Sequence, residues 1–197
     1  MIDMKKTGLV LKTHFPKKRT ITVLEKGGGL AHYITKTEDI CAGTLIQYLI
    51  DTGLALPCLR AMEKIALPLV RAREDILFFH HILELCYYFV PVASHMPEVY
   101  MLIEPFVMQE HTLKNVAEKK FFLVNLFRAF GITPEHENTH AALYAYQYGI
   151  SVDSTGSNTL ELDIERVVDA WLLQCLSLHP YADQFKTMHF LAVNRNL

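Results

Sequence analysis

The sequence contains no closely spaced pair of cysteines. Structural zinc sites normally take their ligands from close pairs on tight turns, such as C-x-x-C, and this chain has no such pair. We therefore expect no metal centre, no other cofactor, and reduced, partly buried thiols of the kind usual in the cytosol. The four separate cysteines are Cys41, Cys58, Cys86 and Cys175.

Long uninterrupted apolar runs are absent as well. The longest apolar stretch, residues 76–92, is broken by His80, His81 and Glu84. A bilayer-spanning helix needs about 20 predominantly apolar residues, so this stretch predicts a buried helix and no membrane contact. The opening segment MIDMKKTGLVLK has no apolar core of signal-peptide length, which leads us to expect a cytoplasmic protein.

The motifs of familiar enzyme classes are also missing. The chain has no G-x-S-x-G nucleophile motif and no G-x-x-x-x-G-K phosphate loop. His80 and His81 are adjacent, and neighbouring helix residues point about 100° apart, so they cannot act on one substrate together. We therefore predict that the protein is not an enzyme and has no catalytic residues. Only a water-filled pocket with convergent titratable groups would indicate an unrecognised small enzyme.

The charge that is present is unevenly distributed. Residues 1–36 hold eight Lys and Arg residues against two acidic residues, a local charge of +6, whereas the rest of the chain holds eleven against nineteen, a charge of −8. Because the net charge is only −2, this asymmetry indicates a local anionic partner. A solvated sheet edge is the alternative, since Lys also protects exposed strands from pairing.

A hydrophobic content of 51% indicates a chain with a substantial core, and its first 68 residues alternate like β-strands. Pro16–Arg19 predicts a turn that carries three cations, and Gly27–Gly29 predicts a tight reversal with positive φ. Five short strands in so few residues predict a small closed or nearly closed barrel. Strict alternation puts Leu9, Leu11, Thr13 and Phe15 on one face of the first strand, and Val10, Lys12 and His14 on the other.

From residue 69 the apolar period becomes that of α-helices. Residues 69–90 are apolar over most of a helix circumference, which predicts a central bundle helix. A second helix is expected from Pro97 with a kink or break at Pro105, and a third over residues 115–130, ending at Gly131. The segment HAALYAYQYGISVD that follows is ambiguous, and its alternating tyrosines favour a short strand. The segments 162–179 and 180–193 complete the helical part.

Several stretches, taken in chain order, resemble the RecO family of bacterial recombination mediators. GLVLKTHFPKKRTITVLEKGGGLAHYI is similar to that family's first three OB-fold strands, and LRAMEKIALPL resembles the passage from its last barrel strand into its helical domain. FFHHILELCYYFVP resembles the first long helix of that domain. KKFFLVNLFRAFGITP is similar to its aromatic-rich helix followed by Gly and Pro, and LHPYADQFKTMHFL to its closing helix.

The resemblance implies an α+β protein with two domains, a five-stranded OB-fold barrel over residues 1–68 and an α-helical domain over residues 69–197. It implies a DNA-binding recombination mediator in recombinational DNA repair, located in the cytoplasm and associated with the nucleoid. The implied partners are single-stranded and double-stranded DNA, the single-stranded DNA-binding protein and RecR.

This chain departs from the family in several places, among them Met188 in the closing segment, where the family often has an Arg. Many members carry closely spaced zinc-binding cysteines after the Gly-x-x-Pro turn, where this chain reads GITPEHENTHAAL. His136 and His140 have the spacing of two ligands on a helix, but no third ligand is evident, so we expect no zinc there. The segment after the third strand, which is basic in the family, is ITKTEDICAG here and leaves Lys36 beside Glu38 and Asp39.

OB-folds bind nucleic acids on an open barrel face, where cations follow phosphates and aromatic rings stack on bases. The resemblance therefore suggests a role for the basic residues of the first strands. The DNA-binding candidates are Lys12, Lys17, Lys18, Arg19 and Lys26, with Lys36 and Lys64 as weaker ones. Candidate stacking residues are Phe15, His32, Tyr33 and Tyr48, of which at least two are expected inside the barrel. The cations of the turn would contact phosphates without reading sequence.

In the family, the helical domain is associated with the C-terminal tail of the single-stranded DNA-binding protein, which ends in an apolar residue and a free carboxylate. Such a tail needs an apolar slot with cations at its rim. Lys120, Val124 and Phe127 fall on one helix stripe, and Arg128 stands four residues beyond Val124. We expect Val124 and Phe127 to line the slot and Lys120 and Arg128 to form its rim. The neighbouring apolar residues expected in the core are Phe122, Leu123, Leu126 and Phe130.

One further class of function stays open. The chain could be a protein-interaction adaptor that keeps the fold and the partner contacts but has lost DNA binding. A titration with labelled single-stranded DNA at two salt concentrations separates this alternative from the DNA-binding mediator, because phosphate contacts make binding salt-dependent.

Overall fold

A computed structural model of the chain describes residues 5–51, 57–108, 113–148 and 158–185. The chain divides into two compact units. The first, the barrel unit, comprises Met1–Thr112 and Phe185–Leu197, and the second, the helical unit, comprises Leu113–Gln184. Each unit is described separately.

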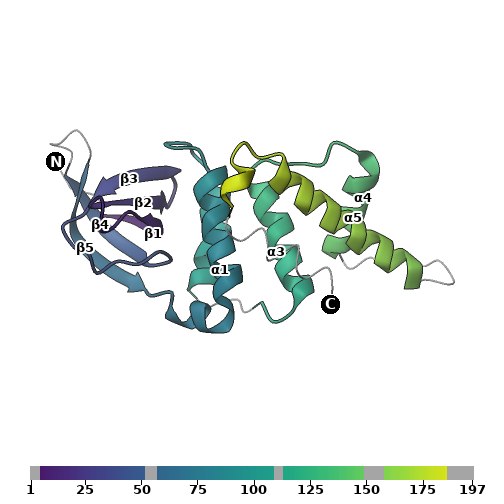
Figure 1. The fold of residues 1–197 in the computed structure, drawn as a ribbon, viewed down its shortest axis with the longest axis horizontal. Helices are drawn as coiled ribbons and strands as arrows, with labels where there is room; N and C mark the ends of the chain where they lie inside the picture. The colour runs from purple at the N-terminus through teal and green to yellow at the C-terminus, as the bar shows by residue number, and fades with distance from the viewer. Residues whose placement is uncertain (1–4, 52–56, 109–112, 149–157, 186–197) are drawn as a thin grey trace. The chain divides into compact units, whose positions relative to one another are not determined.

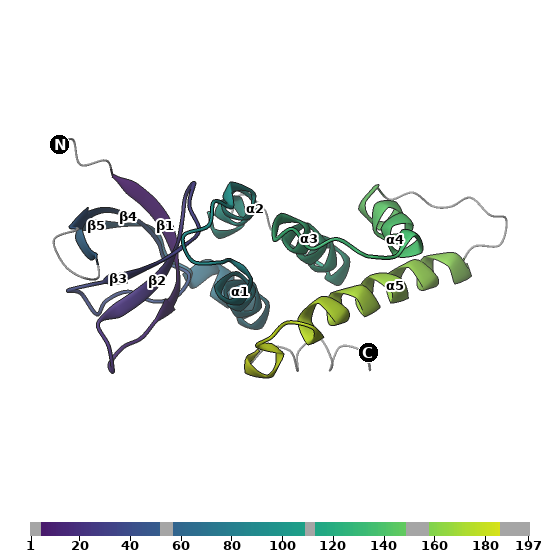
Figure 2. The same cartoon turned by 90° about the horizontal axis from the view of Figure 1, so that it is seen from above.

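The described residues of the barrel unit form five strands, which close into a barrel (Figures 1 and 2). The strands are β1 (Lys6–Thr13), β2 (Thr20–Glu25), β3 (Leu30–Ile34), β4 (Leu45–Asp51) and β5 (Cys58–Ala66). They follow one another round the barrel in the order β1-β2-β3-β5-β4, and β4 pairs with β1. All these pairings are antiparallel except that of β3 with β5. This is the strand order of an OB-fold, and it confirms the predicted five-stranded barrel.

The barrel interior is filled with apolar side chains and two tyrosines. Gly27 in the β2–β3 turn has a φ of 75°, as the glycine triplet predicts, so the two strands can reverse tightly. The buried residues of this core are Val10, Ile21, Val23, Tyr33, Ile40, Ile46, Tyr48 and Leu59.

Strand β1 does not alternate strictly. Val10 is opposite Val23 and Lys12 is opposite Thr22, so Leu11 is the additional residue of a β-bulge. Directly opposed residues point to the same face, and Thr22 points away from the core that holds Val23. The predicted division of β1 into two faces is therefore wrong beyond the bulge: Lys12 points outward, and Phe15 packs against the core with Val10.

Among the described residues of the barrel unit, two helices lie on one side of the barrel (Figure 2): α1 (Leu69–Phe89) and α2 (Pro97–Val107). Asp75 interrupts α1 with extended backbone, and its Oδ1 atom accepts a hydrogen bond of 3.0 Å from the backbone N–H of Phe78. It thus caps the longer segment of α1. Pro97 begins α2, as predicted, and the helix continues through Pro105 to Val107.

The helices are fitted closely to the barrel. Gly43, just before β4, has a φ of 86°, and a Cβ atom there would lie 2.4 Å from the ring of Phe79 on α1. In the β2–β3 turn, a Cβ atom on Gly29 would lie 2.4 Å from the carbonyl oxygen of Ser94, which belongs to the α1–α2 connection. Both contacts need glycine, so α1 and the α1–α2 connection approach the barrel backbone directly.

The division between the units therefore differs from the domain boundary predicted after residue 68. It falls after Thr112, and α1 and α2 group with the barrel. The physical reason is that α1 packs against β1 and places the ring of Phe79 against Gly43 in the segment that precedes β4. A change of hydrophobic period marks the start of helices, but it does not show which layer those helices pack against.

The helical unit contains, among its described residues, α3 (Val116–Ala129), α4 (Glu137–Tyr148), α5 (Asn158–Ser177) and a short 3-10 helix, η1 (Ala182–Gln184). Asn115 caps α3: its Oδ1 atom accepts from the backbone N–H of Glu118 at 2.8 Å, and its side-chain amide donates to Glu118. Gly131, with a φ of 80°, follows the end of α3, as predicted.

The strand predicted for the tyrosine-rich segment is wrong, because these residues form α4. The rings of Tyr144 and Tyr148 lie one helical turn apart with their centroids at 4.5 Å, and both are exposed. Tyr146 lies between them in sequence but donates its hydroxyl to the carbonyl oxygen of Ala117 at 3.0 Å. Alternation of one residue type over five positions thus reflects a helix with two tyrosines on one side and one on another.

Candidate nucleic-acid interface

A row of polar side chains crosses the outer face of β1, β2 and β3. Lys12 is opposite Thr22 in the β1–β2 ladder, and Thr22 is opposite His32 in the β2–β3 ladder. The Thr22 Oγ1 atom lies 3.1 Å from His32 Nδ1 and 3.4 Å from Nε2 of His14 at the end of β1. Thr22 is fully buried between its neighbours, whereas Lys12 and His32 are exposed. The row is therefore an ordered polar surface on the strands that OB-folds use for oligonucleotides.

Positive charge is concentrated around His14. Burial lowers the pKa of His14, and the charges of Lys12, His32 and Lys18 lower it further. The side chains that lower this pKa belong to basic residues, and they come from β1, β3 and the β1–β2 turn. Such a cluster attracts an anion, because an anion relieves the repulsion between the cations. We call Lys12, His14, Lys18 and His32 the basic cluster.

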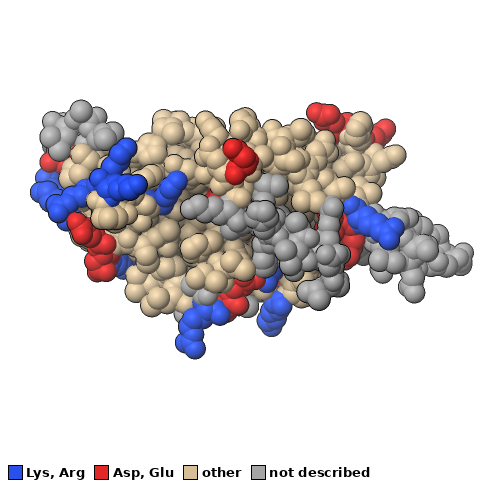
Figure 3. All heavy atoms as spheres, in the orientation of Figure 1, with Lys and Arg blue, Asp and Glu red and all other residues tan. Residues whose placement is uncertain are grey.

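The β1–β2 turn extends this positive surface. Lys17, Lys18 and Arg19 are all exposed, and the turn is closed by a hydrogen bond of 2.9 Å from the backbone N–H of Lys18 to the carbonyl oxygen of His14. Figure 3 shows Lys and Arg side chains gathered over the barrel, with acidic side chains beside them. The turn and the basic cluster thus form one continuous region, as the charge asymmetry of the sequence suggests.

Three of the predicted DNA-binding cations are held by carboxylates. Arg19 pairs with Glu38 at 3.3 Å, and both side chains are exposed. Lys26 pairs with Glu104 on α2 at 3.1 Å, and Lys64 with Asp39 at 2.5 Å. Lys26 thus ties the β2–β3 turn to α2. The remaining candidates form no ion pair with another described residue: Lys12, Lys17, Lys18 and Lys36.

Of the four candidate stacking residues, two are deeply buried. Tyr33 and Tyr48 lie inside the barrel with their ring centroids 5.4 Å apart, which confirms that at least two of the four pack there. Phe15 also packs against the core. His32 is therefore the one of the four that is exposed on the outer face.

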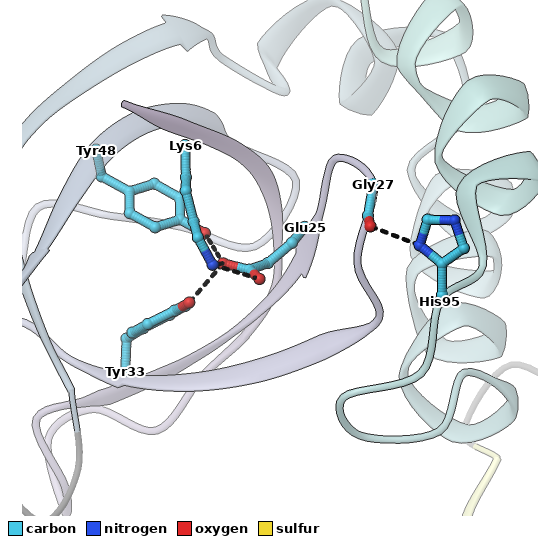
Figure 4. A network of polar contacts seen from close by, with 6 residues as sticks. All are labelled: Lys6, Glu25, Gly27, Tyr33, Tyr48 and His95. Atoms are coloured by element: carbon cyan, nitrogen blue, oxygen red, sulfur yellow. Dashed lines mark hydrogen bonds and ion pairs between the residues drawn. The ribbon is translucent and has the colours of Figure 1, made fainter. Parts of the chain in front are cut away.

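The two buried tyrosines converge on Glu25 at the end of β2 (Figure 4). Tyr33 and Tyr48 donate their hydroxyls to Glu25 Oε1 at 2.5 Å and 2.7 Å, and the Lys6 ammonium pairs with the same carboxylate at 3.0 Å. Burial raises the pKa of Glu25, but these hydrogen bonds outweigh it and hold that pKa below its ordinary value. Burial and the carboxylate raise the pKa of both tyrosines.

Tyr33 and Tyr48 are thus committed to Glu25 within the barrel, and neither ring is available to a ligand on the outer face. Sequence reasoning did not single out Glu25. The available signal was that Glu25 is one of only two acidic residues among the first 36.

Beside the Glu25 network in Figure 4, the His95 imidazole lies 2.8 Å from the Gly27 carbonyl oxygen. This contact is a second tie between the β2–β3 turn and the helices.

A groove of about 170 Å³ lies where β1 meets α1. The Lys12 ammonium lies 4.3 Å from the centroid of the Tyr87 ring, so the end of the polar row touches α1 at this groove. His80 lines the groove, whereas His81 is buried, and burial lowers the pKa of His81 to about 4. The two histidines thus face different surroundings, as predicted. The lining residues are Leu11, Lys12, Ala42, His80, Leu83, Glu84, Tyr87 and Tyr88.

The prediction that Val124 and Phe127 line an apolar slot on α3 for a partner's tail is wrong. Val124 and Phe127 are fully buried, and the ring of Phe127 packs edge-on against Trp171 of α5 at 5.9 Å between centroids. These residues form the core of the helical unit, because α4 and α5 cover that face of α3. The cations intended for the rim are engaged within the unit: Lys120 pairs with Asp169 at 2.9 Å, and Arg128 donates to Gln147.

No protein-family model matches the chain, and no curated protein is significantly similar to it in sequence. Among the helices of the described residues, none has both the length and the apolar character that crossing a bilayer requires. In the same part of the chain, no three His, Cys, Asp or Glu side chains are grouped so that they could hold a metal ion, and this includes the neighbourhood of His136 and His140.

Proposed function

We propose that the protein binds single-stranded nucleic acid across the outer face of β1, β2 and β3, and that it acts as a RecO-like mediator of recombinational DNA repair. The observation that carries this proposal is the basic cluster, in which Thr22 Oγ1 lies 3.4 Å from His14 Nε2 and 3.1 Å from His32 Nδ1, with Lys12 opposite Thr22 on the ladder. The cluster lies on the outer surface of an OB-type barrel, beside a turn with two further exposed cations, Lys17 and Arg19.

The chemistry of this surface suits a phosphate backbone. Lys17 and Lys18 are exposed and form no ion pair with another described residue. A phosphate could therefore bind them without displacing a carboxylate of the described residues. Lys and imidazolium groups donate hydrogen bonds to phosphate oxygens and release condensed counterions when they bind. The exposed ring of His32 offers a face to a base, whereas Tyr33 and Tyr48 are inside the barrel. The surface therefore favours binding that depends on charge and stacking more than on base identity.

The partners proposed for this function are single-stranded and double-stranded DNA, the single-stranded DNA-binding protein and RecR. They rest on the family resemblance of the sequence and on the OB-type barrel followed by helices. For the tail of the single-stranded DNA-binding protein, Val124 and Phe127 are not part of the proposal, because both are buried.

Fluorescence polarisation with a labelled oligothymidylate tests the function directly. We expect saturable binding whose logarithmic association constant falls linearly with the logarithm of the salt concentration, because cations on the barrel replace counterions of the DNA. An unlabelled duplex of equal length should compete less well than the single strand, since the stacking contribution needs exposed bases. A protein that shows no polarisation change at low salt would not be a DNA-binding mediator.

A second candidate function, an adaptor that does not bind DNA, is favoured by a different observation. Arg19, Lys26 and Lys64 are each paired with a carboxylate, so part of the positive charge of the barrel is already neutralised. The same titration separates the two, because an adaptor would fold normally and show no salt-dependent binding to the oligonucleotide.

A further inference from the structure

The groove between β1 and α1 continues the polar row of the barrel. Lys12 belongs to both, since it is opposite Thr22 on the sheet and lies over the Tyr87 ring on α1. Neighbouring strands lie about 4.8 Å apart, so the distance from His32 on β3 to Lys12 on β1 is roughly 10 Å. That distance corresponds to about three nucleotides at the 3.4 Å spacing of a stacked strand. A strand that follows the row therefore arrives at the groove.

The walls of the groove match the shape and chemistry of a nucleobase. A base is a flat aromatic ring with polar atoms only on its edge, and it needs an aromatic or apolar surface on its faces. The groove offers the Tyr87 ring and the apolar side chains of Leu11 and Leu83, while His80 adds a polar group that can meet a base edge. Two charged residues line the groove: Lys12 supplies a cation for a phosphate, and the carboxylate of Glu84 can accept a hydrogen bond from a base edge.

The position of Lys12 shows how a base could enter. Its ammonium group now lies over the Tyr87 ring at 4.3 Å from the centroid, and the Lys12 side chain is exposed. Stacking of a base on an aromatic ring is a stronger interaction than an exposed cation–π contact. A base that stacks on Tyr87 can therefore displace the ammonium group, which is then available to the phosphate of the same nucleotide. One exchange thus produces two contacts with the nucleic acid.

We infer that the groove between β1 and α1 is a binding site for one unpaired nucleobase, with Tyr87 as the stacking ring and Lys12 as the phosphate contact. This inference rests on the proposed function, because the strand reaches the groove along the basic cluster. It extends the nucleic-acid interface beyond the barrel strands to a helix, and it assigns a role to the contact between α1 and β1.

The test uses the full chain and oligothymidylates that carry a single 2-aminopurine at successive positions, since stacking on an aromatic ring quenches the fluorescence of this base. The wild-type protein should quench the probe at one or two positions. Tyr87→Phe keeps the ring and should keep the quenching, whereas Tyr87→Leu should lose it and weaken binding about tenfold. Tyr144→Leu changes an exposed tyrosine of the helical unit and is the matched control, with no expected effect.

A second measurement needs no variant. Oligothymidylate in which 5-iodouracil replaces thymine cross-links under ultraviolet light to aromatic side chains that stack on it, and mass spectrometry identifies the residue. Cross-linking to Tyr87 supports the inference even if Tyr87→Leu fails to fold. Salt-dependent binding with unchanged quenching in a folded Tyr87→Leu variant, or cross-links confined to other residues, overturns the inference but leaves the proposed function standing. Absence of any DNA binding by the wild-type protein overturns both.

Discussion

Lys12 lies directly opposite Thr22 across the β1–β2 ladder, on the outer side of the barrel. The bulge at Leu11 produces this arrangement, because one additional residue reverses the direction of every side chain that follows it. Without the bulge, Lys12 would point into an apolar core, where a charged group has no partner and burial is costly. The bulge therefore brings Lys12 and His14 to the surface that also carries His32, and so creates the basic cluster.

The cations of the β1–β2 turn should contribute to the salt dependence of DNA binding. Replacing Lys17, Lys18 and Arg19 together with Ala should weaken binding to all sequences alike and lower the salt slope by about two to three units. The measurement is the polarisation titration at several salt concentrations. A matched control removes three exposed cations elsewhere, in Lys5→Ala/Arg73→Ala/Lys114→Ala. If the salt slope falls by the same amount in both triple variants, the turn has no special role in DNA binding.

The acidic residues after β3 should restrain DNA binding. Glu38 and Asp39 pair with Arg19 and Lys64, so Glu38→Gln/Asp39→Asn releases both cations and removes two negative charges near the turn. Exposed pairs contribute about 0.2–1 kcal/mol each, and we therefore expect DNA affinity to rise two- to fivefold at low salt and less at high salt. Glu135→Gln/Glu137→Gln, in the helical unit, removes the same charge and should change affinity little. An unchanged affinity in the first variant would show that DNA passes elsewhere.

The hydrogen bonds to Glu25 should stabilise the barrel in a pH-dependent way. Tyr48→Phe removes the hydroxyl that donates to the partly buried Glu25 carboxylate at 2.7 Å, which should lower the free energy of unfolding at pH 7 by about 1.5–3 kcal/mol. Tyr100→Phe is the comparison, because its 3.3 Å hydrogen bond to Glu104 is longer, and its effect should be smaller. Urea denaturation of both variants measures the difference.

The sign of the pH dependence follows from the lowered pKa of Glu25. Its stabilising contribution is present above the ordinary Glu pKa of 4.5 and is lost as the pH falls through the lower value of the folded state. The difference between wild type and Tyr48→Phe should therefore shrink when unfolding is measured at progressively lower pH below 4.5. A difference that stays constant over this range would show that the hydroxyl interacts with the neutral carboxyl group equally well.

DNA affinity should rise as the pH falls. In the protein alone, burial and the basic side chains of Lys12, His32 and Lys18 keep the pKa of His14 below its ordinary value of 6.5. A phosphate on the basic cluster favours the charged imidazole and raises that pKa, so binding takes up a proton as the pH falls toward the lowered pKa of the free protein. Affinity measured from pH 7.5 to pH 5.5 should increase toward the acidic end, and His14→Gln should flatten the profile. A variant with the wild-type profile would exclude His14 as the titrating group.

The parts of this protein that could be predicted from its sequence depend on neighbouring residues along the chain. The turn at Pro16–Arg19, the reversal at Gly27–Gly29, the starts and ends of α1 and α3, and the number of strands follow from turn chemistry, helix caps and hydrophobic period. The concentration of charge in the first strands was equally visible. These features led to the barrel, to the helices and to most of the residues of the basic cluster.

Tertiary structure decided which way those residues point and what covers them. A bulge depends on the pairing partner, so the outward direction of Lys12 needed β2, and its contact with Tyr87 needed α1 packed on β1. Val124 and Phe127 lie on a helix stripe that looks suitable for a partner, but α5 contributes Trp171 to the same face and buries them. These outcomes depend on contacts between residues far apart in the chain, and a local pattern contains no information about which distant element supplies the contact.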